Sequence, residues 1–163
     1  MLKSHVFEVT IKGKHTIVLP KDVVQPFLDN GLSRVQVHAE FGDKEIYFHA
    51  AILGWQGNHI ITFGKKNQKV LGVFPNDYFT IQLLEDLSKY GADMPEELEA
   101  VLASDPEAFH IFERLTAGKK RSIIYMIGRY ASPQTRINKA LILCRNLRAG
   151  VRITRELLKS IGE

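Results

Sequence analysis

The sequence has few of the residues that would identify a disulfide-bonded or thiol-dependent protein. Its 163 residues include one cysteine, Cys144, so a disulfide within the chain is impossible. Cys144 stands among leucines and isoleucines at helical spacing, and no histidine or aspartate is close to it in the sequence. This setting is typical of a buried, unreactive thiol. We therefore expect Cys144 to have only a packing role.

Long apolar runs are also absent. No stretch of the chain approaches the roughly 20 apolar residues that a membrane-spanning helix needs. Residues 1–14 lack the apolar stretch and the small-residue cleavage site of a secretory signal peptide. On these grounds we expect a cytoplasmic protein without a membrane span.

No catalytic signature is present either. The turn that begins at Gly64 carries Lys65 and Lys66 but lacks the spacing of a phosphate-binding loop. His38 and His49 could bind a metal together with a carboxylate if they shared one face of a strand pair, but an exposed strand face is expected to be polar. The sequence thus predicts no catalytic residues, no cofactor and no metal site, and it favours a protein that is not an enzyme.

Charge of one sign is missing from two adjacent stretches. There is no aspartate or glutamate between Arg114 and Arg155, and no lysine or arginine between Asp93 and Glu113. The net charge of the whole chain is only +4, which permits an anionic partner without requiring one. The feature that needs an explanation is therefore the separation of acidic and basic residues along the chain, and not the net charge.

The composition that is present suits a packed protein, with 45% apolar and 25% charged residues. Before about residue 90 the apolar residues alternate with polar ones, and after it they recur every three or four positions. We predict an α+β protein, with a small double-split-like β-barrel over residues 1–88 and a helical domain over residues 93–163. The second domain should contain two or three helices and a short terminal one. Asp105 and Ser132 each precede a proline, which is the pattern of an N-cap followed by the first helical residue.

The clearest predicted strand pair joins residues 34–41 to residues 44–53 through Gly42 and Asp43, a two-residue turn that opens with glycine. This register places three apolar pairs on one face: Val35 with Ala50, Val37 with Phe48, and Ala39 with Ile46. Further strands are expected over residues 5–13, 15–20, 50–55, 59–63 and 77–85, with a turn at residues 56–58. So many strands in so short a segment favour closure into a small barrel.

The N-terminal half also contains an internal likeness. Residues 20–37 and residues 64–81 each have the pattern of a strand end, a short helix, a glycine and a second strand. Gly31 and Gly72 occupy equivalent positions, each followed by an apolar residue. We therefore predict an internal repeat in this half.

Specific stretches resemble known families. IVLPKDVV and KVLGVFPNDYFTIQL resemble the pattern of double-split β-barrels, the group that includes the AbrB and MazE type transcription factors, and residues 5–86 resemble a bacterial domain family of unknown function with that barrel. Residues 96–150 resemble the YdeI/OmpD-associated, or bacteriocin-protection, family. Its hallmarks are present as Phe-Glu-Arg-Leu at 112–115, Lys-Lys-Arg at 119–121 and Thr-Arg at 135–136. The resemblance implies these folds but no known chemistry, and the family label implies a role in envelope protection.

A run of cations at a predicted helix start is the main candidate site. Lys119, Lys120 and Arg121 closely follow Thr116, which is a suitable N-cap. Cations at the N-terminus of a helix face the positive end of its dipole, at a cost of about 0.3 to 1 kcal/mol each at low salt. Some other charge should offset this cost.

Two explanations for the run are open. In the first, its cations pair with the acidic helices just upstream, through Glu97, Glu107 or Glu113. In the second, they hold a phosphate or carboxylate together with exposed backbone N–H groups, and Arg136 and Lys139 extend this anion site.

Together these patterns predict a non-enzymatic binding module that engages an anionic partner through residues 114–155. Nucleic acid or another polyanion is the leading case. The alternative is an interaction protein for stress or envelope protection, of the bacteriocin-protection family, whose charges neutralise one another and whose partner is another protein. An unrecognised enzyme, with groups that meet only in space, is the third hypothesis. The sequence does not predict the oligomeric state.

Overall fold

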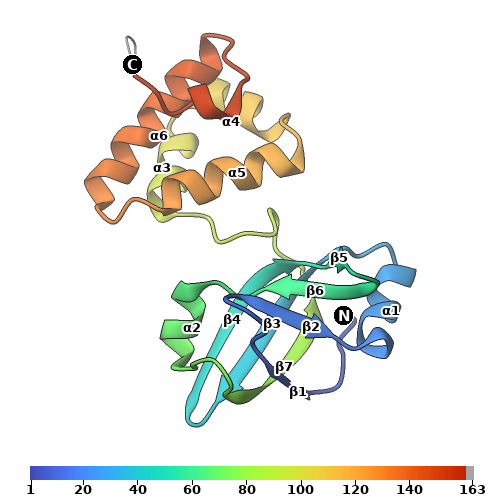
Figure 1. The fold of residues 1–163 in the computed structure, drawn as a ribbon. Coiled ribbons are helices and arrows are strands. Elements are labelled where there is room, and N and C mark those ends of the chain that lie inside the picture. The colour runs from blue at the N-terminus through green and yellow to red at the C-terminus, as the bar shows by residue number, and fades with distance from the viewer. Residues whose placement is uncertain (161–163) are drawn as a thin grey trace. The chain divides into compact units, whose positions relative to one another are not determined.

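The structure of the protein is a computed structural model that describes residues 1–160. The chain divides into two compact units, Met1–Leu87 and Ser88–Glu163 (Figure 1). The first consists mainly of strands and the second of helices, so the predicted α+β class is confirmed. Each unit is described by itself below.

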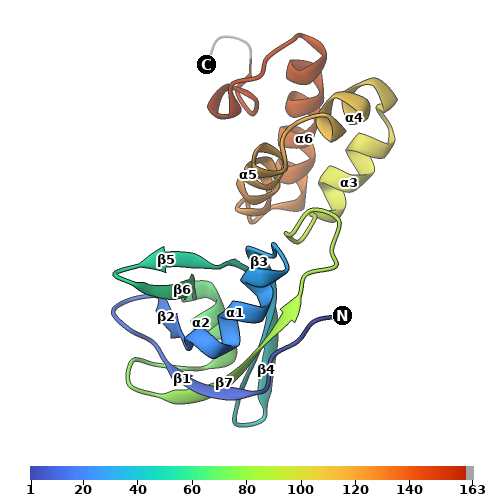
Figure 2. The ribbon, with the colours of Figure 1, turned by 90° about the vertical axis from the view of Figure 1, so that its right-hand side faces the viewer.

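The N-terminal unit has two antiparallel sheets and two short helices. Its elements are β1 (Phe7–Thr10), β2 (Thr16–Leu19), α1 (Lys21–Asp29), β3 (Arg34–Phe41), β4 (Lys44–Ala51), β5 (Leu53–Trp55), β6 (Asn58–Thr62), α2 (Lys65–Leu71) and β7 (Tyr78–Glu85). One sheet has the strand order β1-β7-β3-β4 and the other the order β2-β6-β5. The two sheets lie on different sides of the unit in Figure 2.

The register of the β3–β4 hairpin agrees with the prediction. Val37 pairs with Phe48, as the alternation of apolar residues requires, and the flanking pairs follow in step. Gly42 has a φ of 61°, a conformation in which glycine lacks the Cβ penalty of other residues. The predicted turn at residues 56–58 is one residue too long, because Trp55 pairs directly with Asn58 and Gln56 and Gly57 alone form the turn.

The strand pairing has an internal symmetry that supports the predicted repeat. Strand β2 pairs with β6, and β3 pairs with β7, so the equivalent strands of the two repeats are neighbours. Strands β1 and β4 also correspond, since β1 pairs with β7 as β4 pairs with β3. Helices α1 and α2 lie at opposite ends of the unit (Figure 1). Strand β5 is the element of this unit without a counterpart.

The two sheets enclose one hydrophobic core. Phe63 is fully buried between Phe48 and Phe79, with ring centroids 5.3 and 5.4 Å away. Burial of aromatic side chains contributes a large share of the hydrophobic stabilisation of such a unit. The hydrogen-bonded strands form two sheets and not one ring, so the barrel is not closed.

The C-terminal unit contains α3 (Glu96–Ala103), α4 (Pro106–Glu113), α5 (Ala117–Gly128), α6 (Pro133–Arg148) and a 3₁₀ turn, η1 (Thr154–Glu156). Within residues 1–160 this unit therefore has four α-helices, more than the two or three predicted. Three helices begin at the N-caps that the sequence indicates, Asp105, Thr116 and Ser132, and each of these side chains accepts a backbone N–H three residues on. The helices α3 and α4 are separated by only two residues.

The core of the C-terminal unit is mainly aliphatic and is centred on α6. Phe112 of α4, Ile124 of α5 and Leu143 of α6 are at most 1% exposed. Cys144 is buried beside them, and burial raises the pKa of its thiol to about 11. The expectation of an unreactive packing thiol is thus supported. None of the helices described over residues 1–160 is sufficiently long and apolar to cross a membrane.

Candidate anion-binding site

The positive charge of the protein belongs to the C-terminal unit. Residues 88–163 contain 13 lysines and arginines against 9 aspartates and glutamates, whereas residues 1–87 contain 9 of each. The entire net charge of +4 therefore lies in the helical unit. The contacts of its basic side chains decide which of them are available to a partner.

Lys119 and Lys120 lie in the first turn of α5, as the sequence predicts, and both ammonium groups contact backbone carbonyls. The Nζ atom of Lys119 donates to the carbonyl of Arg152 at 3.3 Å, and Nζ of Lys120 donates to the carbonyl of Glu113 at 3.2 Å. Lys120 also lies over the ring of Tyr90, 5.8 Å from its centroid. Because the Glu113 carbonyl belongs to the last turn of α4, Lys120 neutralises the negative end of that helix.

Glu113 contacts Lys120 and two residues of the segment that precedes the first helix of the unit, Lys89 and Tyr90. Its carboxylate accepts a short hydrogen bond from the hydroxyl of Tyr90 and lies 3.5 Å from Nζ of Lys89. Burial alone would raise the pKa of Glu113, but the Tyr90 hydrogen bond and the charges of Lys89 and Lys120 outweigh it and lower the pKa. The predicted pairing of the cation run with upstream acids is therefore present at Lys120 as a backbone contact and a charge interaction with Glu113.

Arg136 has the most extensive internal contacts of the five predicted residues. Its Nη2 donates to Oε1 of Glu97 at 2.8 Å, and its Nη1 donates to the carbonyls of Tyr130 and Ala131 at 2.7 and 3.1 Å. The hydrogen bond and charge of Glu97 raise the pKa of Arg136, and Arg136 lowers the pKa of Glu97 in return. Arg136 thus ties α3 to the turn between α5 and α6.

The remaining two predicted residues have different environments. Nζ of Lys139 donates to the carbonyl of Leu158 at 3.2 Å and lies 5.7 Å from the ring centroid of Tyr130. The side chain of Arg121 is half-buried and, among residues 1–160, forms no hydrogen bond or ion pair. The structure therefore divides the predicted set between two helices with separate partners, and it leaves Arg121 as the member available for an added anion.

Two arginines of α6 form ion pairs that local sequence spacing does not indicate. Arg148 pairs with Asp105, the N-cap of α4. Arg136 pairs with Glu97 of α3. Both partners come from helices that are distant in sequence, so the pairing depends on the tertiary fold.

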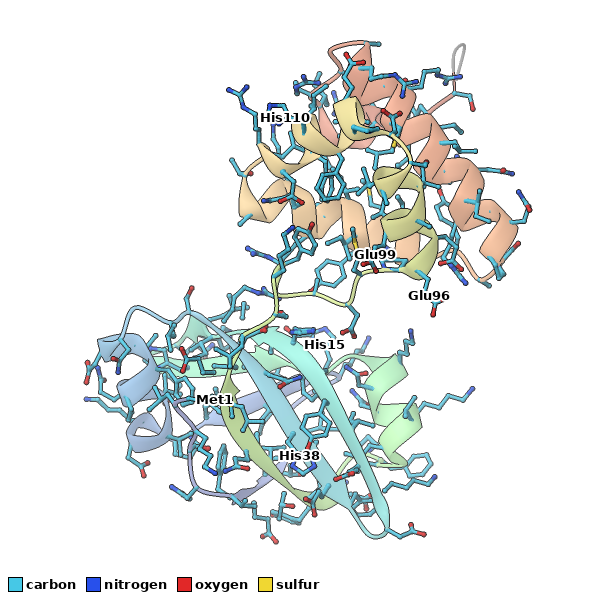
Figure 3. The ribbon with its side chains drawn as sticks, turned by 180° about the vertical axis from the view of Figure 1, so that it is seen from behind. Met1, His15, His38, Glu96, Glu99 and His110 are labelled. Atoms are coloured by element: carbon cyan, nitrogen blue, oxygen red, sulfur yellow. The ribbon has the colours of Figure 1, made fainter. Side chains whose placement is uncertain are left out.

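A pocket in the C-terminal unit brings basic side chains together. It has a volume of about 370 Å³ and is lined by His110, Ile111, Arg114, Leu115 and Arg152. Figure 3 shows His110 on α4. None of the five lining residues is acidic, and Ile111 and Leu115 add an apolar wall. Two arginines and a histidine that line one opening form an environment for a phosphate or a carboxylate.

Internal contacts orient the arginines of this pocket. Nη1 of Arg152 donates to the carbonyls of Leu147 and Val151 at 3.0 and 2.8 Å, which fixes the side chain after the end of α6. Lys119 donates to the carbonyl of Arg152 and therefore lies beside the pocket. Arg114 is the C-cap of α4 and its side chain is exposed.

Sequence reasoning placed Arg114 and Arg152 in the basic segment but did not select them. They are 38 positions apart and meet only because the segment after α6 returns to the end of α4. His110 lies outside the basic segment altogether. The acid-free run from Arg114 to Arg155 was the available signal, but it could not indicate which of its cations share a pocket.

The two histidines of the β3–β4 hairpin have separate partners. Nδ1 of His49 lies 2.7 Å from Oδ2 of Asp86, with both side chains almost fully buried. Nε2 of His38 lies instead near Glu40 and Glu45 on the outward face of the sheet. The pair of imidazoles weighed as metal ligands from the sequence therefore does not share one set of carboxylates.

The comparisons with known proteins bear on the helical unit. Residues 91–150 match the model of the family described as OmdA: Bacteriocin-protection, YdeI or OmpD-Associated. This match to the bacteriocin-protection family spans α3 to α6 and confirms the resemblance drawn from the C-terminal motifs. Arg114 and His110 lie inside the matched region, and Arg152 lies just after it.

Two further comparisons complete the findings. No curated protein matches this chain. Among solved structures, the solution structure of PHS018 from Pyrococcus horikoshii is similar at 22% sequence identity, over 52% of this chain and 94% of that chain, with a TM-score of 0.41.

Proposed function

We propose that this protein is a non-enzymatic binding module whose C-terminal unit engages an anionic partner, with nucleic acid as the specific case. The observation that carries the proposal is the pocket lined by His110, Arg114 and Arg152, which contains no acidic residue. Guanidinium groups form paired, charge-assisted hydrogen bonds to phosphate oxygens, so this lining suits a phosphate group. The proposal thus retains the predicted function, but it assigns anion binding to residues that the sequence analysis did not select as site residues.

Cations outside the pocket favour an extended partner over a single small anion. Arg121 and Arg129 have no acidic partner among residues 1–160, and Lys119 lies beside the pocket. A phosphate chain that occupies the pocket with one group can reach Lys119, and further cations of the unit, with others. Each phosphate so neutralised releases condensed counterions, which is the main source of affinity in sequence-independent binding.

The experiment is a titration of the full-length protein into a labelled short DNA duplex at several salt concentrations. We expect binding at low ionic strength that weakens as salt rises, because each neutralised phosphate contributes about 0.9 to the logarithmic salt slope. Inorganic phosphate serves as the competitor and should displace DNA only at high concentration, since it occupies the pocket alone. Absence of binding at low salt, or binding that does not respond to salt, contradicts the proposal.

A second candidate function has its own support. The match of residues 91–150 to the bacteriocin-protection family favours an interaction protein that acts in stress or envelope protection. The ion pairs of Glu97 with Arg136 and of Asp105 with Arg148 reduce the charge that is available to a polyanion. This function predicts no salt-dependent DNA binding and a protein partner instead, so the same titration separates the two candidates.

A further inference from the structure

The outward face of the four-stranded sheet carries a group of side chains that the proposed function does not use. His38 and Glu40 lie two positions apart on β3, and Glu45 lies on β4. Nε2 of His38 is 2.8 Å from Oε2 of Glu45 and 3.4 Å from Oε1 of Glu40. The ligand atoms of all three residues lie within 4.8 Å of one another, and no other group within residues 1–160 is so arranged. Figure 3 shows His38 on this hairpin.

The charges of this group are unfavourable without a cation. Glu40 and Glu45 are paired directly across the two strands, and like charges in that position destabilise a strand pair. Within residues 1–160, His38 is the one basic side chain that lies within ion-pair distance of these two carboxylates. When the imidazole is neutral, the group therefore has two negative charges and no positive one. A divalent cation supplies the missing charge.

The histidine is held in position for such an ion. Its ring stacks on the ring of Tyr47, with centroids 4.4 Å apart and an interplanar angle of 13°. The side chain of His38 is only 15% exposed, whereas the side chains of Glu40 and Glu45 are 56% and 61% exposed. The nitrogen ligand is thus fixed by the sheet, and the carboxylates on the open side can adjust to the ion. Water can occupy the remaining coordination positions.

We propose that His38, Glu40 and Glu45 bind one divalent transition-metal ion, with Zn²⁺ or Mn²⁺ as the best match to the donor set. Metal–ligand distances of about 2.0 to 2.2 Å place the ligands of one zinc ion roughly 3 to 4.4 Å apart. The observed separations are close to that range, so only small side-chain movements are needed. An imidazole nitrogen with two carboxylates favours these ions over Mg²⁺ and Ca²⁺, which prefer oxygen ligands alone.

The test is calorimetric titration of the metal-free, full-length protein with ZnCl₂, repeated with MgCl₂. We expect saturable binding of one Zn²⁺ per chain, and binding of Mg²⁺ that is at least tenfold weaker. Glu45→Gln should weaken the binding of Zn²⁺ at least tenfold, and His38→Gln should weaken it further, since each removes a ligand. His5→Gln is the matched control, because His5 is an exposed histidine of the same unit, and it should bind Zn²⁺ like the wild type.

Thermal melting provides a second measurement. Saturating Zn²⁺ should raise the melting temperature of the wild type and of His5→Gln, but not that of Glu45→Gln, because a ligand that binds only the folded state stabilises it. Glu45 is exposed, so its replacement should not prevent folding, and circular dichroism checks this. Equal Zn²⁺ affinity in wild type and Glu45→Gln, equal affinity for Mg²⁺ and Zn²⁺, or no 1:1 binding overturns the metal site.

Discussion

Single basic residues of the helical unit differ mainly in the contacts of their charged ends. Lys120, Arg136 and Arg148 each contact an acidic residue or a helix terminus of their own unit. Arg114 and Arg152 instead line a pocket without acids. The sequence shows the same residue types in all five positions, because a side chain's partner in another helix is not encoded by local spacing. Burial and tertiary contacts therefore decide which cations hold the fold together and which can bind a partner.

The ion pair of Glu97 with Arg136 gives a prediction for stability at low pH. The hydrogen bond from Arg136 holds the pKa of Glu97 below its ordinary value of 4.5. A carboxyl whose pKa is lowered by folding contributes stability above its unfolded pKa and loses it as the pH falls through the folded pKa. Glu97→Gln should therefore lower the melting temperature at pH 7, and the difference from wild type should shrink below about pH 4.5.

Thermal melts of both proteins across the acid range measure this difference. Glu99→Gln is a suitable control, since Glu99 is an exposed acid of the same helix and has no ion pair in the described chain. A difference between wild type and Glu97→Gln that persists unchanged at low pH would contradict the assigned pairing.

The elements of the fold were predicted best where a pattern is local. The register of the β3–β4 hairpin follows from its alternating apolar residues and its Gly42 turn, and the structure agrees pair by pair. The N-caps at Asp105, Thr116 and Ser132 were equally readable. The break between β4 and β5 was not, because a single residue, Ile52, separates the two strands and leaves the alternation of the chain uninterrupted.

Val37 tests the sheet packing. It is fully buried in the N-terminal core, so Val37→Asp places an unpaired charge among apolar side chains at a cost of several kcal/mol. We expect the N-terminal unit to unfold, with loss of the strand signal in circular dichroism. Gln36→Asp, on the opposite face of the same strand, should retain the fold. Equal melting of the two variants would mean that the face assignment is wrong.

Lys120 and Lys119 form a matched pair at the start of α5. Lys120→Glu removes the cation at the last turn of α4 and adds a carboxylate near Glu113, so it should destabilise the protein by about 1 to 3 kcal/mol. Lys119→Glu places a negative charge at a helix N-terminus, which the dipole favours, and should change stability much less. Denaturant unfolding of both variants measures the difference, and equal effects would contradict the contacts assigned to Lys120.

At the scale of the whole molecule, the chain combines two units of different charge. The strand unit has no net charge, and the helical unit carries the whole net charge of +4. The change in periodicity near residue 90 was the basis for predicting two domains, and the contacts of the chain divide it between Leu87 and Ser88. The pocket could not be predicted in the same way, since it depends on the segment after α6 returning to α4.

The boundary between the units should be the first site of limited proteolysis. Residues 86–95 contain no helix or strand, and backbone outside regular structure is the preferred substrate of proteases. Brief digestion should give one fragment near residues 1–87 and one near residues 93–163, and the first should have a strand-type circular dichroism spectrum. Primary cleavage outside residues 86–95, or a helical spectrum for the first fragment, would contradict the division.

The most direct test of the proposed function compares DNA binding by Arg114→Gln/Arg152→Gln with binding by Lys65→Gln/Lys66→Gln. Both double variants lose two positive charges, but only the first loses them from the pocket. The account predicts that the pocket variant binds at least tenfold more weakly and that its logarithmic salt slope falls by up to about 2, while the Lys65 and Lys66 variant retains the wild-type slope. Equal losses in the two variants, at unchanged melting temperatures, would show that net charge and not the pocket drives binding, and would contradict the account.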